Sequence, residues 1–194
     1  YRRLCRLIEQ VIEANPAGLC PKELQKLKGE FIFLQSFAAF NDIEKMDEGR
    51  RAALEILRGP ADLIVNTMSW TFGGTSVLSL FWRTSGRLDD TLRHMDECLP
   101  SYLKLTRGHG CGGDSVLRAE TMLMRGEDGA AEGLCHRALY NARNHRQTDI
   151  CLCAELILAR IAILRGDVEG YFIAVKNIKD YAGTDANLYV LRMV

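Results

Sequence analysis

The segment from Thr106 to Ser115, TRGHGCGGDS, comes closest to a phosphate-binding sequence. A glycine-rich loop that leads into a helix can hold an anion, because the first N–H groups of the helix carry partial positive charge. A P-loop also needs a preceding strand and a Lys followed by Ser or Thr, and this segment has neither feature. We therefore expect a helix start capped by Asp114 or Ser115 instead of a nucleotide site.

His109 and Cys111 offer two metal ligands within the same segment. A structural zinc site takes four ligands, and no second pair stands at a suitable spacing. Other Cys and His residues do not complete the set, because helix positions one or two apart point in different directions. The scattered histidines, with Glu120 and Glu155 as lone acids of predicted helices, form no group of nucleophile, base and orienting residue. The sequence predicts no metal site, no cofactor in this chain and no enzyme activity.

Two aromatic residues, Trp70 and Phe72, lie in residues 66–76, NTMSWTFGGTS, where two glycines break the helical pattern. The Thr or Ser that follows the glycines can cap the next helix. Two interpretations stay open: the aromatic side chains pack beneath the loop, or they form a lip that contacts a ligand, since loops on rigid scaffolds often carry function. We take them, together with Trp82 and His109, as candidate ligand- or partner-binding residues.

The composition bounds the class of protein. The chain has 194 residues, 47% hydrophobic and 26% charged, enough for a substantial core. Lys and Arg equal Asp and Glu at 25 each, so the basic excess typical of a DNA-binding domain is missing. Seven cysteines without a disulfide spacing indicate reduced thiols in the cytoplasm, and no signal peptide or membrane-length apolar run is present. Because the sequence starts without Met and ends inside a helical pattern, we expect a fragment of a longer protein.

Turn sequences recur at a regular interval. Gly86, Gly126 and Gly166 are 40 residues apart, and Asn41 marks a fourth turn 45 residues before the first of them. Gly and Asn favour the left-handed conformation that ends a helix, and the acidic residues that follow favour the start of the next one. A period near 40 predicts an all-α, superhelical stack of antiparallel helical hairpins that is similar to tetratricopeptide repeats.

The pattern assigns the elements of this stack. Predicted helices occupy residues 2–14, 22–40, 43–57, 75–84, 88–104, 114–125, 128–144, 148–165 and 168–181, and another starts at 186–194. They pair into hairpins at 22–57, 75–104, 114–144 and 148–181 within a single repeat domain, 1–194. Small residues recur at matching offsets from the turn glycines, where tetratricopeptide helices cross closely: Ala119, Ala131, Ala138 and Ala159.

Arg118, Arg125 and Arg160 lie on the first helices of two predicted hairpins. In tetratricopeptide stacks these helices line the concave surface, where the arginines could present cations to an acidic ligand or peptide. The alternative is a solvated face with local ion pairs, such as Arg160 with Glu155. We keep the three arginines as candidate ligand- or partner-binding residues.

Several short runs carry a resemblance to a known family. They are WTFG (70–73), SGRLD (85–89), MDECLP (95–100), GHGCG (108–112), RAE (118–120), MRG (124–126) and LARIA (158–162). In this order, and with the 40-residue period, they resemble the helical-repeat region of large bacterial LuxR-type transcriptional regulators of the MalT-like family. The resemblance is best from about residue 26 to 181.

This resemblance implies a role. Family members have an N-terminal ATPase, which uses ATP, and a C-terminal LuxR-type helix-turn-helix. Their repeat region senses an inducer or a regulatory protein and governs self-association. The chain would then be a ligand-sensing or protein-interaction domain that reaches DNA only through a domain it lacks. The alternative is a protein-docking or oligomerisation scaffold with no small-molecule ligand.

Overall fold

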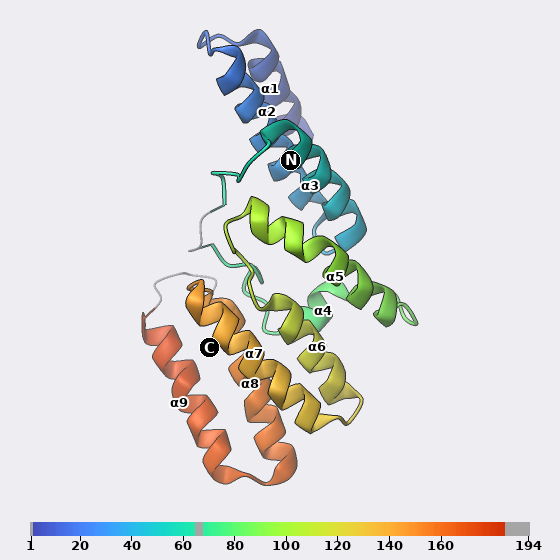
Figure 1. Cartoon of the computed structure of the whole chain (residues 1–194), viewed down its shortest axis with the longest axis vertical. Coiled ribbons are helices and arrows are strands. Elements are labelled where there is room, and N and C mark those ends of the chain that lie inside the picture. The colour runs from blue at the N-terminus through green and yellow to red at the C-terminus, as the bar shows by residue number, and fades with distance from the viewer. Residues whose placement is uncertain (1, 65–67, 185–194) are drawn as a thin grey trace. The chain divides into compact units, whose positions relative to one another are not determined.

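The computed structural model describes residues 2–64 and 68–184, and every regular element in those ranges is a helix (Figure 1). The prediction of an all-α fold is confirmed. The elements are α1 (Arg2–Ala14), α2 (Pro21–Ser36), the short 3₁₀ helix η1 (Phe37–Ala39), α3 (Ile43–Leu57), α4 (Val77–Phe81), α5 (Leu88–Leu105), α6 (Gly113–Met124), α7 (Asp128–Asn144), α8 (Thr148–Arg165) and α9 (Val168–Thr184). The helix predicted at 186–194 lies outside the described residues.

The chain divides into two compact units, residues 1–63 and 64–194, and each is described by itself. The single repeat domain expected over 1–194 stays a prediction. In neither described range is there a helix with the length and apolar content that crossing a membrane requires.

The first unit is built around a hairpin of α2 and α3. Its turn contains Asn41 in the left-handed conformation, with φ 62°, as the sequence predicts, and the Asp42 side chain caps α3. The helix predicted at 22–40 ends earlier, because α2 stops at Ser36 and continues as η1. A Cβ atom on Gly49 would lie 2.7 Å from the Cβ of Ser36, so this glycine allows the two helices to approach closely.

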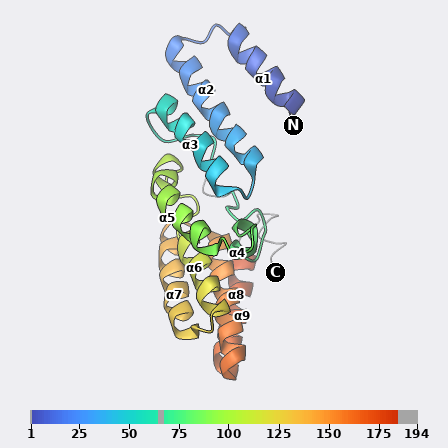
Figure 2. The same cartoon turned by 90° about the vertical axis from the view of Figure 1, so that its right-hand side faces the viewer.

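In the second unit, α6, α7, α8 and α9 run antiparallel, each against the next in sequence, and α6 also contacts α8 (Figures 1 and 2). The turn residues Gly126 and Gly166 have φ 79° and 67°, the left-handed conformation expected at these helix ends. The observed bounds of α7 and α8 agree with the predicted ones, since such turns are specified by local sequence.

The element that departs most from prediction is α4, which is much shorter than the expected helix at 75–84. Ser76 caps it, as one of the two residues expected there. Trp82 leaves the helical conformation with ψ 97°, so Gly86 follows a loop and not a helix end. By contrast, α5 runs through Pro100 to Leu105, one residue beyond the end predicted at 104.

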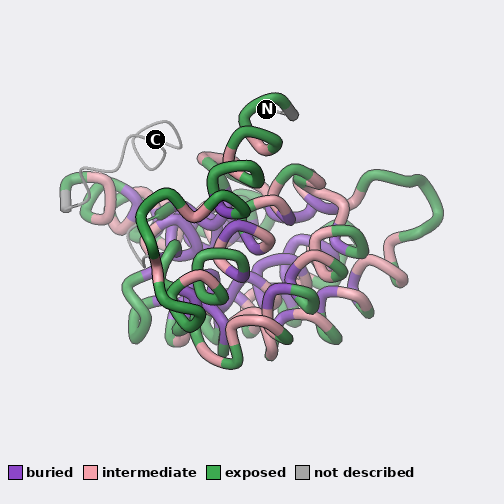
Figure 3. The backbone as a smooth tube through the Cα atoms, turned by 90° about the horizontal axis from the view of Figure 1, so that it is seen from above, coloured by how far each residue is buried: buried purple, intermediate pink, exposed green. Residues whose placement is uncertain are grey.

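The most buried helix of the second unit is α8, since nearly every position in its first four turns is enclosed. Figure 3 colours the backbone by burial, with buried residues in purple. It contacts α6, α7 and α9 on different sides. All four alanines expected at close crossings are buried: Ala119, Ala131, Ala138 and Ala159. A helix apolar on all sides has to be covered on all sides, so the fold of this unit is organised around α8.

Candidate functional site

Trp70 belongs to the core of the second unit. Its side chain is 7% exposed and packs against the Phe81 ring in a tilted arrangement, with centroids 5.5 Å apart. A Cβ on Gly113 would lie 2.7 Å from the indole, and one on Gly110 would clash with it as well. The glycines of the 106–115 segment thus make room for an aromatic ring. Packing beneath the loop is the correct interpretation for Trp70, whereas Phe72 is 40% exposed.

His109 is buried and both of its ring nitrogens have partners. Nε2 donates to the carbonyl of Met68 at 3.0 Å, so Nδ1 accepts the hydroxyl proton of Tyr102 at 2.7 Å. Burial lowers the pKa of His109, although the Met68 carbonyl favours the protonated form. His109 is therefore a neutral structural residue, and the described part of the chain holds no cluster of three or more possible metal ligands.

The expected helix cap in this segment is wrong. The N-cap position of α6 belongs to Gly112, with φ 98°, and neither Asp114 nor Ser115 caps the helix. A Cβ on Gly112 would lie 2.9 Å from the carbonyl oxygen of Ala138 on α7, so the helix starts where only glycine fits. This close approach was not predictable from the segment itself, because Ala138 belongs to another helix, α7.

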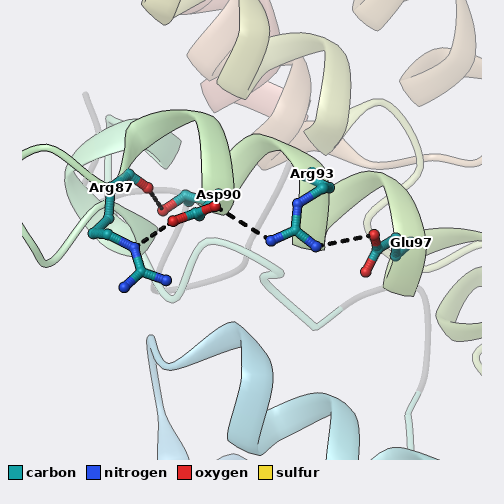
Figure 4. Close-up of polar contacts among 5 residues, drawn as sticks. Arg87, Asp90, Arg93 and Glu97 are labelled. Carbon is teal, nitrogen blue, oxygen red and sulfur yellow. Dashed lines mark hydrogen bonds and ion pairs between the residues drawn. The ribbon is translucent and has the colours of Figure 1, made fainter.

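Two of the three candidate arginines pair with acids on α5. Arg118 contacts Asp96, and Arg125 lies 2.9 Å from Asp89. Other charged side chains of α5 pair along the helix itself, through Arg87, Asp90, Arg93 and Glu97 (Figure 4). These two arginines thus form ion pairs with acids of another helix, whereas the local pair expected between Arg160 and Glu155 is absent from the described residues, where Glu155 lies near Arg143 instead.

The other candidate binding residues, Arg160 and Trp82, do not form one site with Arg118 and Arg125. Arg160 is exposed. Burial raises the pKa of Glu120, and the positive charge of Arg160 acts in the opposite direction. The indole of Trp82 donates to the carbonyl of Thr84 at 2.9 Å. The predicted binding residues therefore lie partly in the core and partly in separate surface pairs.

A polar network that the sequence did not indicate joins three segments at the start of α8. The Oδ2 atom of Asp149 accepts from the Thr71 N–H at 2.8 Å and from the Ser69 hydroxyl at 3.1 Å. Gln147 accepts from the Gly110 N–H at 2.6 Å. Asp149 and Gln147 are both nearly fully buried. Their hydrogen bonds attach the 69–71 segment and the glycine-rich loop to the start of α8.

A groove of about 480 Å³ lies along α8, between α7 and α9. Its apolar lining comes from all three helices: Leu139, Leu158, Ile161, Ala162, Ile173 and Ala174. Glu132, His136, Arg143, Arg165 and Asp167 add polar groups. A volume between about 300 and 1,000 Å³ is typical of small-molecule sites.

Glu155 is the polar group buried deepest in this groove, with a side chain only 2% exposed. Its Oε1 atom accepts from the amide of Asn177 at 3.0 Å. The Arg143 guanidinium is 3.6 Å from the same oxygen and donates instead to the Tyr181 hydroxyl at 2.6 Å. Burial raises the pKa of Glu155, while Asn177 and Arg143 favour its charged form.

Arg165, at the end of α8, is neutralised locally. It lies 2.5 Å from Asp128 and 2.7 Å from Glu132, both on α7. Asp167 accepts from the Gly170 N–H at 2.9 Å and so caps α9. The groove is lined by three acids, Glu132, Glu155 and Asp167, and by Arg143, Arg165 and His136, and Glu132 is already paired with Arg165.

No family model matches the chain, and no curated protein and no solved structure matches it. The resemblance to MalT-like regulators therefore rests on the sequence runs given above.

The Asp149 network has a predicted effect on stability. Replacing Asp149 with Ala leaves the Thr71 N–H and the Ser69 hydroxyl without this buried acceptor. We expect the free energy of unfolding to fall by about 3 kcal/mol, since each unmade buried hydrogen bond costs about 1–3 kcal/mol. Urea titration followed by circular dichroism measures this. The control is Asp89→Ala, which removes an exposed ion pair worth less than about 1 kcal/mol; equal losses in the two variants would contradict the assignment.

The neutral His109 predicts a pH dependence. The unfolded chain protonates this residue near pH 6.5, whereas the folded chain protonates it at lower pH because of burial. The unfolded state then binds more protons just below that pH, so stability falls as the pH falls through this window. His109→Gln, which cannot titrate, should lose less stability between pH 7 and 5 in the same unfolding assay. A constant difference between wild type and variant over this range would show that His109 does not carry the effect.

Proposed function

We propose that the chain is a ligand-sensing helical-repeat domain of a LuxR-type, MalT-like transcriptional regulator, built as a tetratricopeptide-like stack. The observation that carries the proposal is the groove over α8, which joins an apolar lining to one deeply buried carboxylate. Sites for small molecules typically combine apolar walls with a few well-placed polar groups. The sequence runs and the 40-residue interval between turn glycines support the family and the repeat.

The groove is a suitable place for sensing, because three helices contribute to it. A ligand between α7 and α9 touches both hairpins, α6–α7 and α8–α9, at once. It stabilises the arrangement in which all its contacts are made and shifts the population toward it. In the full regulator, that shift would be transmitted to the ATPase and DNA-binding domains that the resemblance implies.

The proposed ligand site therefore differs from the aromatic lip, which was one of the two interpretations left open for Trp70 and Phe72. Trp70 is enclosed by Phe81 and by the glycine-rich loop and offers little surface to a ligand. Phe72 is exposed but does not line the groove. Among the residues predicted to bind, none lines the groove over α8.

A second candidate function, self-association without a small ligand, is favoured by a separate observation. Four large apolar side chains near the α8–α9 turn are each more than 60% exposed: Ile163, Leu164, Val168 and Phe172. We call these four residues the turn patch. An exposed apolar patch of this kind often marks a protein–protein contact.

Two neighbouring residues of α9 separate the two functions. Ile173 lines the groove, and Phe172 belongs to the turn patch; both are more than half exposed, so an Arg at either position is compatible with folding. A thermal-shift screen of sugars, amino acids, amines and aromatic metabolites should find compounds that raise the Tm of wild type and Phe172→Arg but not of Ile173→Arg. A ligand at about 100 times its Kd adds about 2.7 kcal/mol of stability.

Either of two results would contradict the proposal. If no compound shifts the Tm at millimolar concentration, or if Ile173→Arg responds as wild type does, the groove is not the sensing site. If, in addition, light scattering gives an oligomer for wild type and a monomer for Phe172→Arg, self-association through the turn patch is the better assignment.

A further inference from the structure

The Glu155 carboxylate has one oxygen with partners and one without. Oε1 receives both contacts, from Asn177 and Arg143, and Oε2 has no hydrogen-bond partner among the described residues. In the part of the chain that the structure describes, no fully enclosed side-chain nitrogen or oxygen lacks a partner. Oε2 is therefore not fully enclosed, and Glu155 is one of the residues that line the groove.

The charge of this carboxylate is partly compensated, by the Asn177 hydrogen bond, by the Arg143 ion pair and by the charge of His136. Arg143 is 3.6 Å from Oε1, longer than a hydrogen bond, and its Nε–H is directed to Tyr181. The guanidinium also lies over the Tyr181 ring, 5.9 Å from its centroid, which keeps it at the edge of the groove. A buried carboxylate whose second oxygen has no hydrogen bond is stabilised further when a cation approaches that oxygen.

The other residues that line the groove indicate what kind of cation would bind there. Arg165 is already neutralised by Asp128 and Glu132, so an anionic ligand finds no available guanidinium there and meets Glu155 at the floor. The apolar residues of α7, α8 and α9 provide contact for a hydrocarbon body, and about 480 Å³ is far more than a single inorganic ion fills.

From this geometry we propose that the groove over α8 binds a small organic amine, whose ammonium group hydrogen-bonds to Oε2 of Glu155 and whose apolar body lies against Leu158, Ile161 and Ile173. The inference rests on the proposed function, because it names the chemical class of ligand for the same groove. Glu155 then acts as the residue that distinguishes an amine from an alcohol or a carboxylate of the same shape.

The experiment uses probes that differ only in the polar group: 2-phenylethylamine, 2-phenylethanol and 3-phenylpropionate, each titrated by calorimetry into the whole chain. We expect the amine to bind wild type most tightly and to lose about tenfold or more in affinity in Glu155→Gln, because a charge-assisted hydrogen bond is lost. The alcohol should bind both proteins equally. Glu169→Gln, an exposed acid of α9 that does not line the groove, is the matched control and should bind the amine as wild type does.

A second variant guards against misfolding of the first. Arg143→Gln changes a half-exposed side chain and removes the positive charge nearest to Glu155, so it should raise the affinity for the amine several-fold. Unchanged amine affinity in Glu155→Gln, or lower affinity in Arg143→Gln, overturns the inference.

Other outcomes separate the inference from the proposed function. If the alcohol or the carboxylate binds as tightly as the amine and Ile173→Arg abolishes this binding, the groove is a ligand site, but the assignment to amines is wrong. If a lysine-containing peptide binds more tightly than the amine and depends on Glu155, the occupant is a basic protein segment. If no probe binds at all, the inference fails, whereas the proposed function fails only if the thermal-shift screen also finds no compound that depends on Ile173.

Discussion

The hydrogen bonds of Asp149 are the interaction on which the second unit depends. This buried carboxylate holds Ser69 and Thr71 against the first turn of α8, and Gln147 holds the glycine-rich loop beside them. With these segments fixed, Trp70 fills the space left by Gly110 and Gly113. One end of α8 is thereby covered by chain that precedes it by tens of residues, and a helix so apolar is stable only when covered in this way.

Further along the same helix, the cover is incomplete. Two turns after Asp149, Glu155 reaches Asn177 and approaches Arg143 on the neighbouring helices, but α7 and α9 leave a groove between them. The two acids of α8 thus have opposite environments. Both hydrogen bonds to Oδ2 of Asp149 come from the protein, whereas Oε2 of Glu155 has no hydrogen-bond partner among the described residues. We place the ligand at Glu155 because its carboxylate lacks a hydrogen bond that the protein supplies to Asp149.

The sequence predicted what is encoded locally. The bounds of α3, α7 and α8 follow from Asn and Gly turns next to periodic apolar runs, and the structure has the same bounds. The site was not predictable in this way. Trp70 and His109 seemed available because the glycines that enclose the first and the carbonyl that binds the second are some 40 residues away. Glu155 looked like a lone helix acid, since its neighbours Arg143 and Asn177 come from two other helices. A pattern within one segment of the sequence does not indicate contacts between residues of different helices.

The most direct test of this account is a methyl NMR titration of the isoleucine-labelled chain with 2-phenylethylamine. Ile161 and Ile173 line the groove, whereas Ile163, on the same helix as Ile161, is exposed outside it. The account predicts saturable shifts of the Ile161 and Ile173 methyl signals, with Ile163 and the first-unit residues Ile12 and Ile43 unchanged. Shifts centred on Ile163, on Ile12 or on Ile43, or no saturable shift at any isoleucine, would contradict the assignment of the groove over α8 as the ligand site.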